Sequence, residues 1–253
     1  MKATVNRLWV LIIVLVVCFA GCSKKSDSHS GSNVYISPTL AKDTLIKIPD
    51  QMVTKSNTDM NLYEGVLGID LVNVFSTGLS GAFIYDQSTV DGWAATKNSD
   101  GSTSYAWNYL QYTVKLTYYH SGSESWWKYE EDSASYSFPL YYIDDKGTSG
   151  ETDWYGQEYF KSKQLLAFKD IWTKSGDTNN STFSIYSTDG TTVSTQYVST
   201  SKTDKSGTLK VYGQNNYTGP LVQQWYYVWD KTGSGSYIHY KADGTTIDFQ
   251  GTF

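Results

Sequence analysis

Acidic residues in the middle of the chain are the side chains best suited to chemistry. They form two groups: Glu130, Glu131 and Asp132 make the first, and Asp144, Asp145, Glu151 and Asp153 make the second. A glycoside hydrolase needs two carboxylates about 5–10 Å apart across a cleft. Acidic runs beside turns are more often solvated surface. A carboxylate-based glycoside hydrolase is therefore the third function that the sequence suggests, after two kinds of binding.

Histidines and motifs give little support to other catalysis. His29 falls in a polar linker, while His120 and His239 fall in predicted strands, where we expect satisfied polar residues. The chain has no Gly-x-Ser-x-Gly elbow, His-Glu-x-x-His pair or P-loop. The acidic loop lacks the regular spacing of a calcium loop. We therefore predict no catalytic residue, no metal site and no cofactor.

Aromatic residues offer the more promising binding chemistry. Trp126 and Trp127 are adjacent, so in a strand one of them leaves the core unless both faces are covered. Trp225, Tyr227 and Trp229 share one face of a later strand. These five residues are the candidate ligand contacts. The competing interpretation is that the rings fill the core of a curved sheet.

The elements that position these residues are mostly strands. Alternation of apolar and polar residues through stretches such as LQYTVKLTY is typical of half-buried antiparallel strands. Asp100-Gly101, Asp189-Gly190 and Asp243-Gly244 predict tight type I′ hairpins. We expect a mainly β fold of roughly eight to ten strands. It would be an antiparallel meander sheet, strongly curved as a half-barrel or closed as a barrel, because a sheet this long must curl.

One early helix is expected near residues 58–78, packed on the sheet. Asn57, Thr58 and Asp59 supply N-caps, and a wide apolar stripe follows at helical spacing, which predicts a largely buried helix. Gly65 and Gly68 weaken this interpretation by up to about 1 kcal/mol each. A buried strand pair is the alternative.

The N-terminus reads as an export signal. Lys2 and Arg7 precede an apolar run at 8–20, which is short for a membrane span. The run ends in Phe19-Ala20-Gly21-Cys22, which resembles the lipobox of bacterial lipoproteins, with Phe19 where that family usually has leucine. The resemblance implies cleavage after Gly21, lipid attachment at Cys22 and, with Ser23 following, an outer-membrane location in either leaflet. An ordinary secreted protein and an uncleaved N-terminal helix are the alternatives.

The predicted domains follow from this signal. Residues 1–21 are the signal peptide, 22–45 the lipidated N-terminus and flexible tether, and 46–253 a single β-rich domain. Cys18 and Cys22 are the chain's two cysteines, so that domain has no disulfide and no thiolate site. Loss of Lys2 and Arg7 takes the net charge from −5 to −7 and removes the chain's one arginine. Nucleic acid is therefore not an expected partner.

These observations indicate a membrane-anchored envelope lipoprotein whose work is not catalytic. Its first expected role is binding or assembly of an apolar ligand or a protein partner. The alternative is a surface glycan-binding lipoprotein that uses exposed aromatic residues. The expected partners are the membrane, through the N-terminal lipid, and a lipid, a glycan or an envelope protein.

Overall fold

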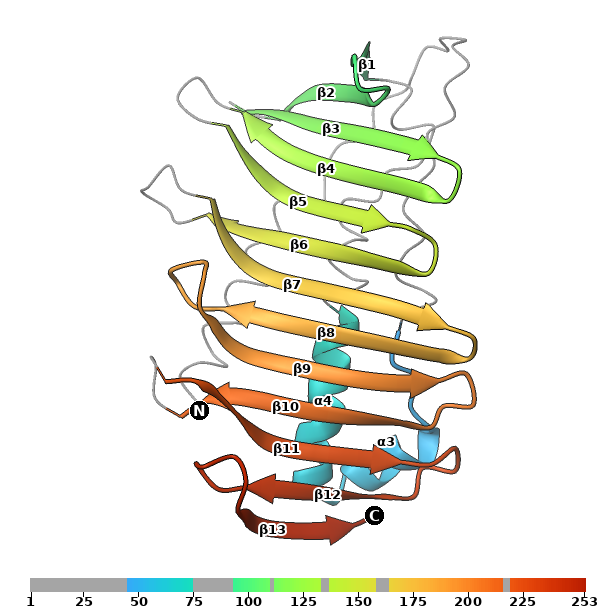
Figure 1. The fold of residues 1–253 in the computed structure, drawn as a ribbon, viewed down its shortest axis with the longest axis vertical. Coiled ribbons are helices and arrows are strands. Elements are labelled where there is room, and N and C mark those ends of the chain that lie inside the picture. The colour runs from blue at the N-terminus through green and yellow to red at the C-terminus, as the bar shows by residue number, and fades with distance from the viewer. Residues whose placement is uncertain (1–44, 75–92, 110–111, 133–136, 158–163, 216–218) are drawn as a thin grey trace.

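The computed structural model describes residues 45–74, 93–109, 112–132, 137–157, 164–215 and 219–253. Two helices come first, α3 (Asp50–Ser56) and α4 (Met60–Asn73). The strands then follow in chain order (Figure 1): β1 (Ala94–Lys97), β2 (Thr103–Tyr109), β3 (Tyr112–Ser121), β4 (Glu124–Asp132), β5 (Ser137–Asp145), β6 (Ser149–Gln157), β7 (Gln164–Ser175), β8 (Thr178–Tyr186), β9 (Val193–Lys202), β10 (Gly207–Gln214), β11 (Leu221–Trp229), β12 (Gly235–Tyr240) and β13 (Ile247–Thr252).

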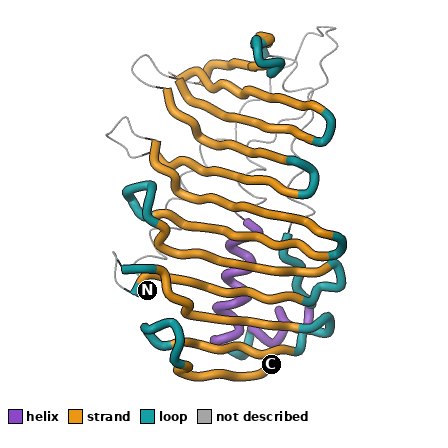
Figure 2. Tube along the Cα trace, in the orientation of Figure 1, coloured by secondary structure: helices purple, strands orange, loops and turns teal. Residues whose placement is uncertain are grey.

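The described strands form one sheet in which each strand pairs antiparallel with the next along the chain. The expected mainly β antiparallel meander, with a helix packed on it, is confirmed. The sheet has thirteen strands among the described residues, more than the eight to ten expected. It is open, with β1 and β13 at its two edges, so the closed form of the expected barrel is not formed. Figure 2 shows the strands as one continuous layer with both helices on one side of it.

The face that carries the helices is called the inner face, and the opposite one the open face. Across β2–β7 the inner face holds a buried cluster of Tyr105, Leu116, Tyr118, Trp127, Tyr129, Tyr141, Ile143, Trp154 and Trp172. Strand alternation explains it, because in β4 Trp127 and Tyr129 are buried while Lys128 between them turns to the open face. The aromatic residues dispersed along the sequence are therefore largely core.

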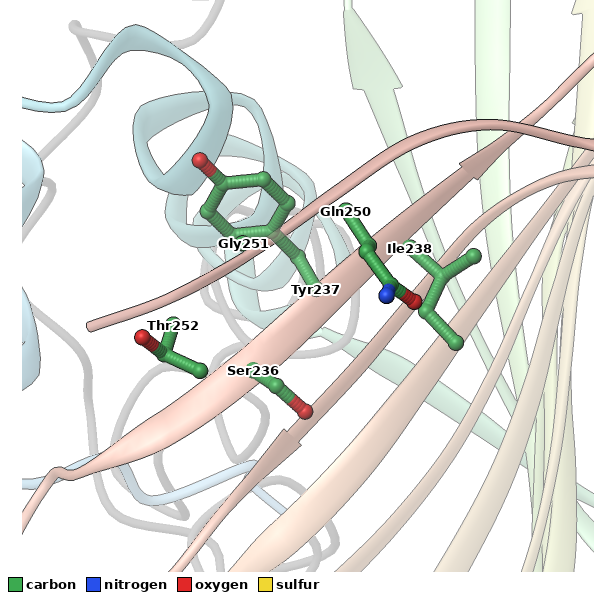
Figure 3. A pocket seen from close by; sticks show the side chains of 6 residues that line it. All are labelled: Ser236, Tyr237, Ile238, Gln250, Gly251 and Thr252. Atoms are coloured by element: carbon green, nitrogen blue, oxygen red, sulfur yellow. The ribbon is translucent and has the colours of Figure 1, made fainter.

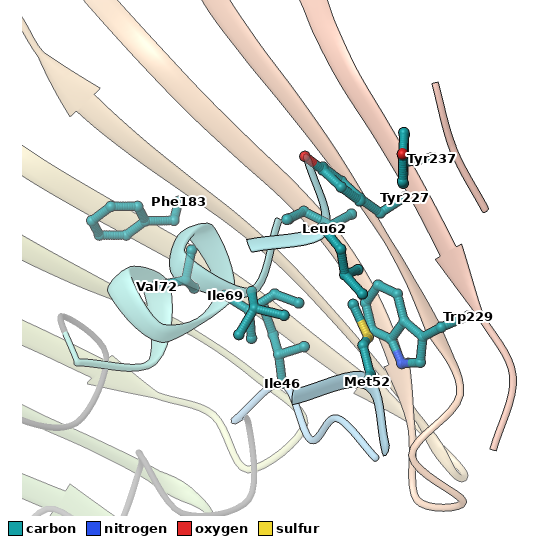
Figure 4. Close-up of a cluster of buried hydrophobic side chains, with 11 residues drawn as sticks. Ile46, Met52, Leu62, Ile69, Val72, Phe183, Tyr227, Trp229 and Tyr237 are labelled. Atoms are coloured by element: carbon teal, nitrogen blue, oxygen red, sulfur yellow. The ribbon is translucent and has the colours of Figure 1, made fainter. Parts of the chain in front are cut away.

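Helix α4 covers the inner face of the C-terminal strands, running across them (Figure 1). Its buried side joins Phe183, Leu209, Tyr227, Trp229 and Tyr237 of the sheet in a second core cluster (Figure 4). The carboxylate of Asp59 caps α4 by accepting from the N–H groups of Asn61 and Leu62 at 2.9 and 3.1 Å. The expected helix is confirmed within the described residues, and the strand-pair alternative is wrong. Helix α3 was not expected.

The outer side of α4 departs from the expectation of a largely buried helix. Leu62, Val66 and Ile69 are buried against the sheet, whereas Tyr63 and Leu67 on the other side are 43% and 39% exposed. The wide apolar stripe that predicted a largely buried helix is therefore covered by the sheet along one side only, among the described residues.

The Asp-Gly hairpins form where expected, with a different backbone from the one predicted. A type I′ turn needs positive φ at both central residues. Gly101, Gly190 and Gly244 have φ of 86°, 67° and 70°, but the aspartates before them do not have positive φ. A wider turn, with glycine in the left-handed conformation after the aspartate, fits the backbone hydrogen bonds of these loops.

The predicted signal peptide at 1–21 and the lipid site at Cys22 lie outside the described residues, as does the 22–45 tether except for Leu45. Neither α3 nor α4 has the length and apolar character of a helix that crosses a membrane.

Candidate functional site

The predicted aromatic contacts divide between the two faces of the sheet. Trp127, Tyr227 and Trp229 are on the inner face and only 2%, 0% and 2% exposed, so they have almost no surface to offer a ligand. Trp225 is on the same face and half-buried. Trp126 points to the open face and is half-buried.

Trp225 is explained by packing at the C-terminal edge of the sheet. Its ring lies 4.5 Å from that of His239 and 5.5 Å from that of Phe249, centroid to centroid. The His239 ring nitrogen Nδ1 is 3.2 Å from Asp248 Oδ2. Trp225 thereby packs at the edge of the second core cluster. His239 is a partnered polar residue, as the sequence predicted.

Trp126 is half of an aromatic pair on the open face. Its ring stacks with that of Tyr119 on β3, with centroids 5.7 Å apart and an angle of 15° between the planes. Both rings are half-buried, so each keeps part of its face in solvent. Neither described helix approaches this face (Figure 1).

Two carboxylates continue the line of this aromatic pair across the sheet. Trp126 pairs with Asp144 of β5, and Asp144 pairs with Glu151 of β6. Adjacent strands are about 4.8 Å apart, so Tyr119, Trp126, Asp144 and Glu151 stand in a row at that spacing. We call these four residues the open-face row. Beside the row, Lys146 Nζ lies 2.9 Å from Asp144 Oδ2.

A second row, one pair further along the strands, contains a buried acid. Tyr142, Asp153 and Lys169 face one another across β5, β6 and β7. Lys169 Nζ is 2.6 Å from Glu151 Oε1 and 3.4 Å from Asp153 Oδ1. The Tyr155 hydroxyl donates to Asp153 Oδ2 at 3.3 Å. The two rows thus share one ion-pair network.

The surroundings of Asp153 raise the pKa of its carboxyl group. Asp153 is 7% exposed, and this burial raises its pKa to about 6, with Glu151 adding to the rise and Lys169 opposing it. Burial, followed by the negative charges around them, raises the pKa of Tyr142 and Tyr155 to about 12. Both tyrosines therefore remain neutral hydroxyl groups at physiological pH.

Glu151 and Asp153 do not have the arrangement of the two catalytic carboxylates of a glycosidase. Glu151 Oε1 and Asp153 Oδ1 lie 2.6 and 3.4 Å from Lys169 Nζ, so these two oxygens are at most about 6 Å apart, at the short end of the range that such enzymes use. However, the ammonium group of Lys169 stands between them, where the substrate bond or a water would have to lie. Geometry therefore favours a structural ion pair over an acid–base pair.

A serine and a histidine meet on the inner face without forming a triad. His120 Nδ1 is 2.7 Å from Ser125 Oγ, and Asp145 is the next residue in register beyond Ser125. A triad needs the histidine between the serine and the acid. Here the serine is in the middle, and Asp145 Oδ1 accepts from the backbone N–H of Gly147 instead.

Within the described ranges, no three His, Cys, Asp or Glu side chains are grouped so that they could hold a metal ion. No known family model matches the chain, and no curated protein matches it. The open-face row is the candidate site on geometry alone. Its aromatic half was predicted at Trp126. Asp144 and Glu151 were considered from the sequence only as carboxylates of a glycoside hydrolase, and Tyr119 was missed. The four residues were not brought together, because the register that pairs Asp144 with Glu151 and Trp126 with Tyr119 is not written in either segment separately.

Proposed function

We propose that this protein is a membrane-anchored envelope lipoprotein that binds a glycan, without catalysis, on the open face of its sheet. The anchor rests on the lipobox-like segment ending at Cys22. The observation that carries the glycan is the stacked and partly exposed pair of Tyr119 and Trp126, with Asp144 and Glu151 beside it.

The chemistry of this row suits a sugar chain. Aromatic faces stack on the C–H face of a pyranose ring, and carboxylates accept hydrogen bonds from its hydroxyl groups. The strand spacing of about 4.8 Å is close to the length of one sugar ring, so successive strands present successive contacts. Lys146 and Lys169 offset the charges of Asp144 and Glu151, so the row suits a neutral glycan.

An apolar ligand has less support. A carrier needs a concave, mostly apolar cavity. On the inner face, α4 and the aromatic side chains occupy the space over the C-terminal strands (Figure 4). A protein partner is the second candidate, and the exposed strand β13 is the observation that favours it.

The glycan proposal is tested on the full chain in detergent, with a glycan array followed by titration of the best neutral glycan. Trp126→Ala should weaken binding roughly 5- to 150-fold, because stacking on an aromatic ring contributes about 1–3 kcal/mol by analogy with base stacking. Tyr226→Ala is the matched control, since Tyr226 lies on the open face of β11, away from the row. Equal losses in both variants, or no binding to any glycan, would reject the proposal.

A further inference from the structure

Strand β13, at the C-terminal edge of the sheet, pairs along one side only with another described strand, β12. Gly235 and Phe253 exchange both backbone hydrogen bonds, at 2.9 and 3.0 Å. Bonded and non-bonded pairs alternate along an antiparallel ladder, so Gly251 is a bonded partner of β12, whereas Gln250 and Thr252 are not. The N–H and C=O groups of Gln250 and Thr252 therefore point away from β12. Figure 1 shows no described element beyond them.

This edge has few of the features that keep strand edges apart. Native proteins protect edges with proline, lysine, short strands or bulges. Strand β13 contains neither proline nor lysine, and Ile247 and Phe249 are 48% and 39% exposed. One bulge, at Asp248, interrupts its pairing with β12. The opposite edge, β1, is a strand of four residues that ends in Lys97.

We propose that β13 is a self-association edge, at which two copies of the chain pair their β13 strands antiparallel around a two-fold axis through Gln250. In this register Gln250 faces Gln250 of the second copy, so the outward N–H and C=O groups of both copies are satisfied. The sheet then continues from one copy into the other. Because such an axis is perpendicular to the sheet, the two open faces lie on the same side.

The side chains of β13 fit this register. Phe249 faces Gly251 of the second copy, which has no side chain of its own and is covered by the Tyr237 ring of that copy, so an apolar ring meets an aromatic surface there. Asp248 faces the neutral Thr252 of the second copy, so no like charges meet. A hollow of about 380 Å³ lies beside the edge, lined by Ser236, Tyr237, Ile238, Gln250, Gly251 and Thr252 (Figure 3). In this register the Gln250 side chain of the second copy would lie next to the Gln250 side chain that lines this hollow.

A second copy fits better than an unrelated strand, because one symmetric contact satisfies both edges and leaves no β13 free to add further chains. The contact consists of one strand from each copy, so it buries less area than the interfaces of stable dimers. We therefore expect a reversible dimer whose population rises with concentration.

The test measures the mass of the full chain in detergent by sedimentation velocity over a range of concentrations. Gln250→Pro removes the outward N–H and leaves the bonds of Gly251 to β12 in place. Gln250→Ala keeps the N–H and is the matched control. Wild type and Gln250→Ala should dimerise, and Gln250→Pro should dimerise at least tenfold more weakly. Monomers at every concentration in the wild type, or an unchanged dimer in Gln250→Pro, would overturn the proposal.

Oxidative cross-linking tests the register and does not depend on the fold tolerating proline. Facing residues of a bonded antiparallel pair have Cα atoms about 5.5 Å apart, a distance that a disulfide spans. Gln250→Cys should therefore link two copies, whereas Thr252→Cys, which faces Asp248, should not. Linking of Thr252→Cys in place of Gln250→Cys, or of neither variant, would overturn the register. A heavier species that contains a foreign polypeptide would show that β13 serves another partner.

Discussion

Tyr227 lies against Gly65 of α4, at a position where the helix has no room for a side chain. A Cβ atom on Gly65 would come within 2.6 Å of Tyr227 Cε1. The Tyr227 hydroxyl donates to the carbonyl of Asn61 at 2.9 Å. The ring is fully buried. The glycine therefore sets how closely α4 approaches the sheet, and the hydroxyl fixes the position of the helix along it.

Gly65→Ala should destabilise the protein despite improving helix propensity. Alanine gains up to about 1 kcal/mol in the helix, whereas forcing an extra methyl group into a packed core costs about 1–3 kcal/mol. We expect a net loss of about 1–2 kcal/mol in the free energy of unfolding by urea denaturation. Glu64→Ala, on the exposed side of α4, is the control for helix propensity. A Gly65→Ala protein as stable as this control would contradict the packing argument.

The helix shows what the sequence can and cannot predict. Its capping residue and apolar spacing predicted α4 and its buried side. The glycines at 65 and 68 counted against it, because local propensity is blind to the ring on another element that makes glycine necessary. Tyr197 Cε1, at 3.0 Å from a Cβ on Gly68, repeats the situation.

Lys205 has positive φ, a conformation that among the described residues is otherwise taken by glycine, as at Gly101, Gly190 and Gly244. Its φ is 70°, and its carbonyl accepts from Trp229 Nε1 at 2.7 Å. Lys205→Gly should raise the free energy of unfolding by up to about 1 kcal/mol, because the left-handed conformation costs other residues roughly 1–2 kcal/mol and glycine's own entropy offsets part of the gain. Lys202→Gly, where φ is not positive, should destabilise. Equal effects of the two changes in urea denaturation would contradict this account.

The hairpin at Asp204-Lys205 was not predicted from the sequence, because it lacks the Asp-Gly pair that marked the others. Asp204-Lys205 forms the same backbone bonds as Asp100-Gly101, with Lys205 N–H donating to the carbonyl of Lys202. Asp204 also accepts from Ser206 as Asp100 does from Ser102. The turn is specified by the aspartate, and the glycine only relieves strain.

Asp243 holds the β12–β13 hairpin by accepting three hydrogen bonds. The Thr246 hydroxyl and the N–H groups of Thr245 and Thr246 all donate to it. These bonds lower its pKa from 3.8 to about 2. A lowered folded-state pKa stabilises the fold above the unfolded value, and this stabilisation is lost as pH falls from 3.8 towards 2. Asp243→Ala should therefore lower the melting temperature at pH 7 and converge with wild type in acid.

Asp243→Asn is the control for that profile, since its amide oxygen keeps the backbone bonds but does not titrate in this range. We expect its melting temperature at pH 7 to lie between those of wild type and Asp243→Ala. A gap between wild type and Asp243→Ala that stays constant down to pH 2 would contradict the assignment.

The candidate site was predictable in part. Because adjacent strand residues face opposite ways, one of Trp126 and Trp127 had to leave the inner face. Which one leaves depends on the phase of β4, which its pairing with β3 and β5 decides. Trp225, Tyr227 and Trp229 share a face, as predicted, but that face is the one α4 covers, and no local pattern in β11 tells which face a distant helix will choose.

Asp153 gives the opposite pH dependence from Asp243. Burial raises its folded-state pKa from 3.8 to about 6. The protein therefore gains stability from this group below pH 3.8 and loses it as pH rises through 6. Asp153→Asn, which cannot ionise, should be more stable than wild type at pH 7, and the difference should vanish below about pH 4. The gain should be about 1 kcal/mol, less than the shift alone implies at 1.36 kcal/mol per pKa unit, because Lys169 loses one of its two anions. Glu151→Gln is the matched variant, because it removes the anion that lies closer to the same ammonium group, at 2.6 Å. It should lower the stability of the protein at pH 7. Thermal melts of the three proteins from pH 3 to 8 measure both effects, and an Asp153→Asn curve parallel to wild type throughout would show that the buried acid does not titrate with folding.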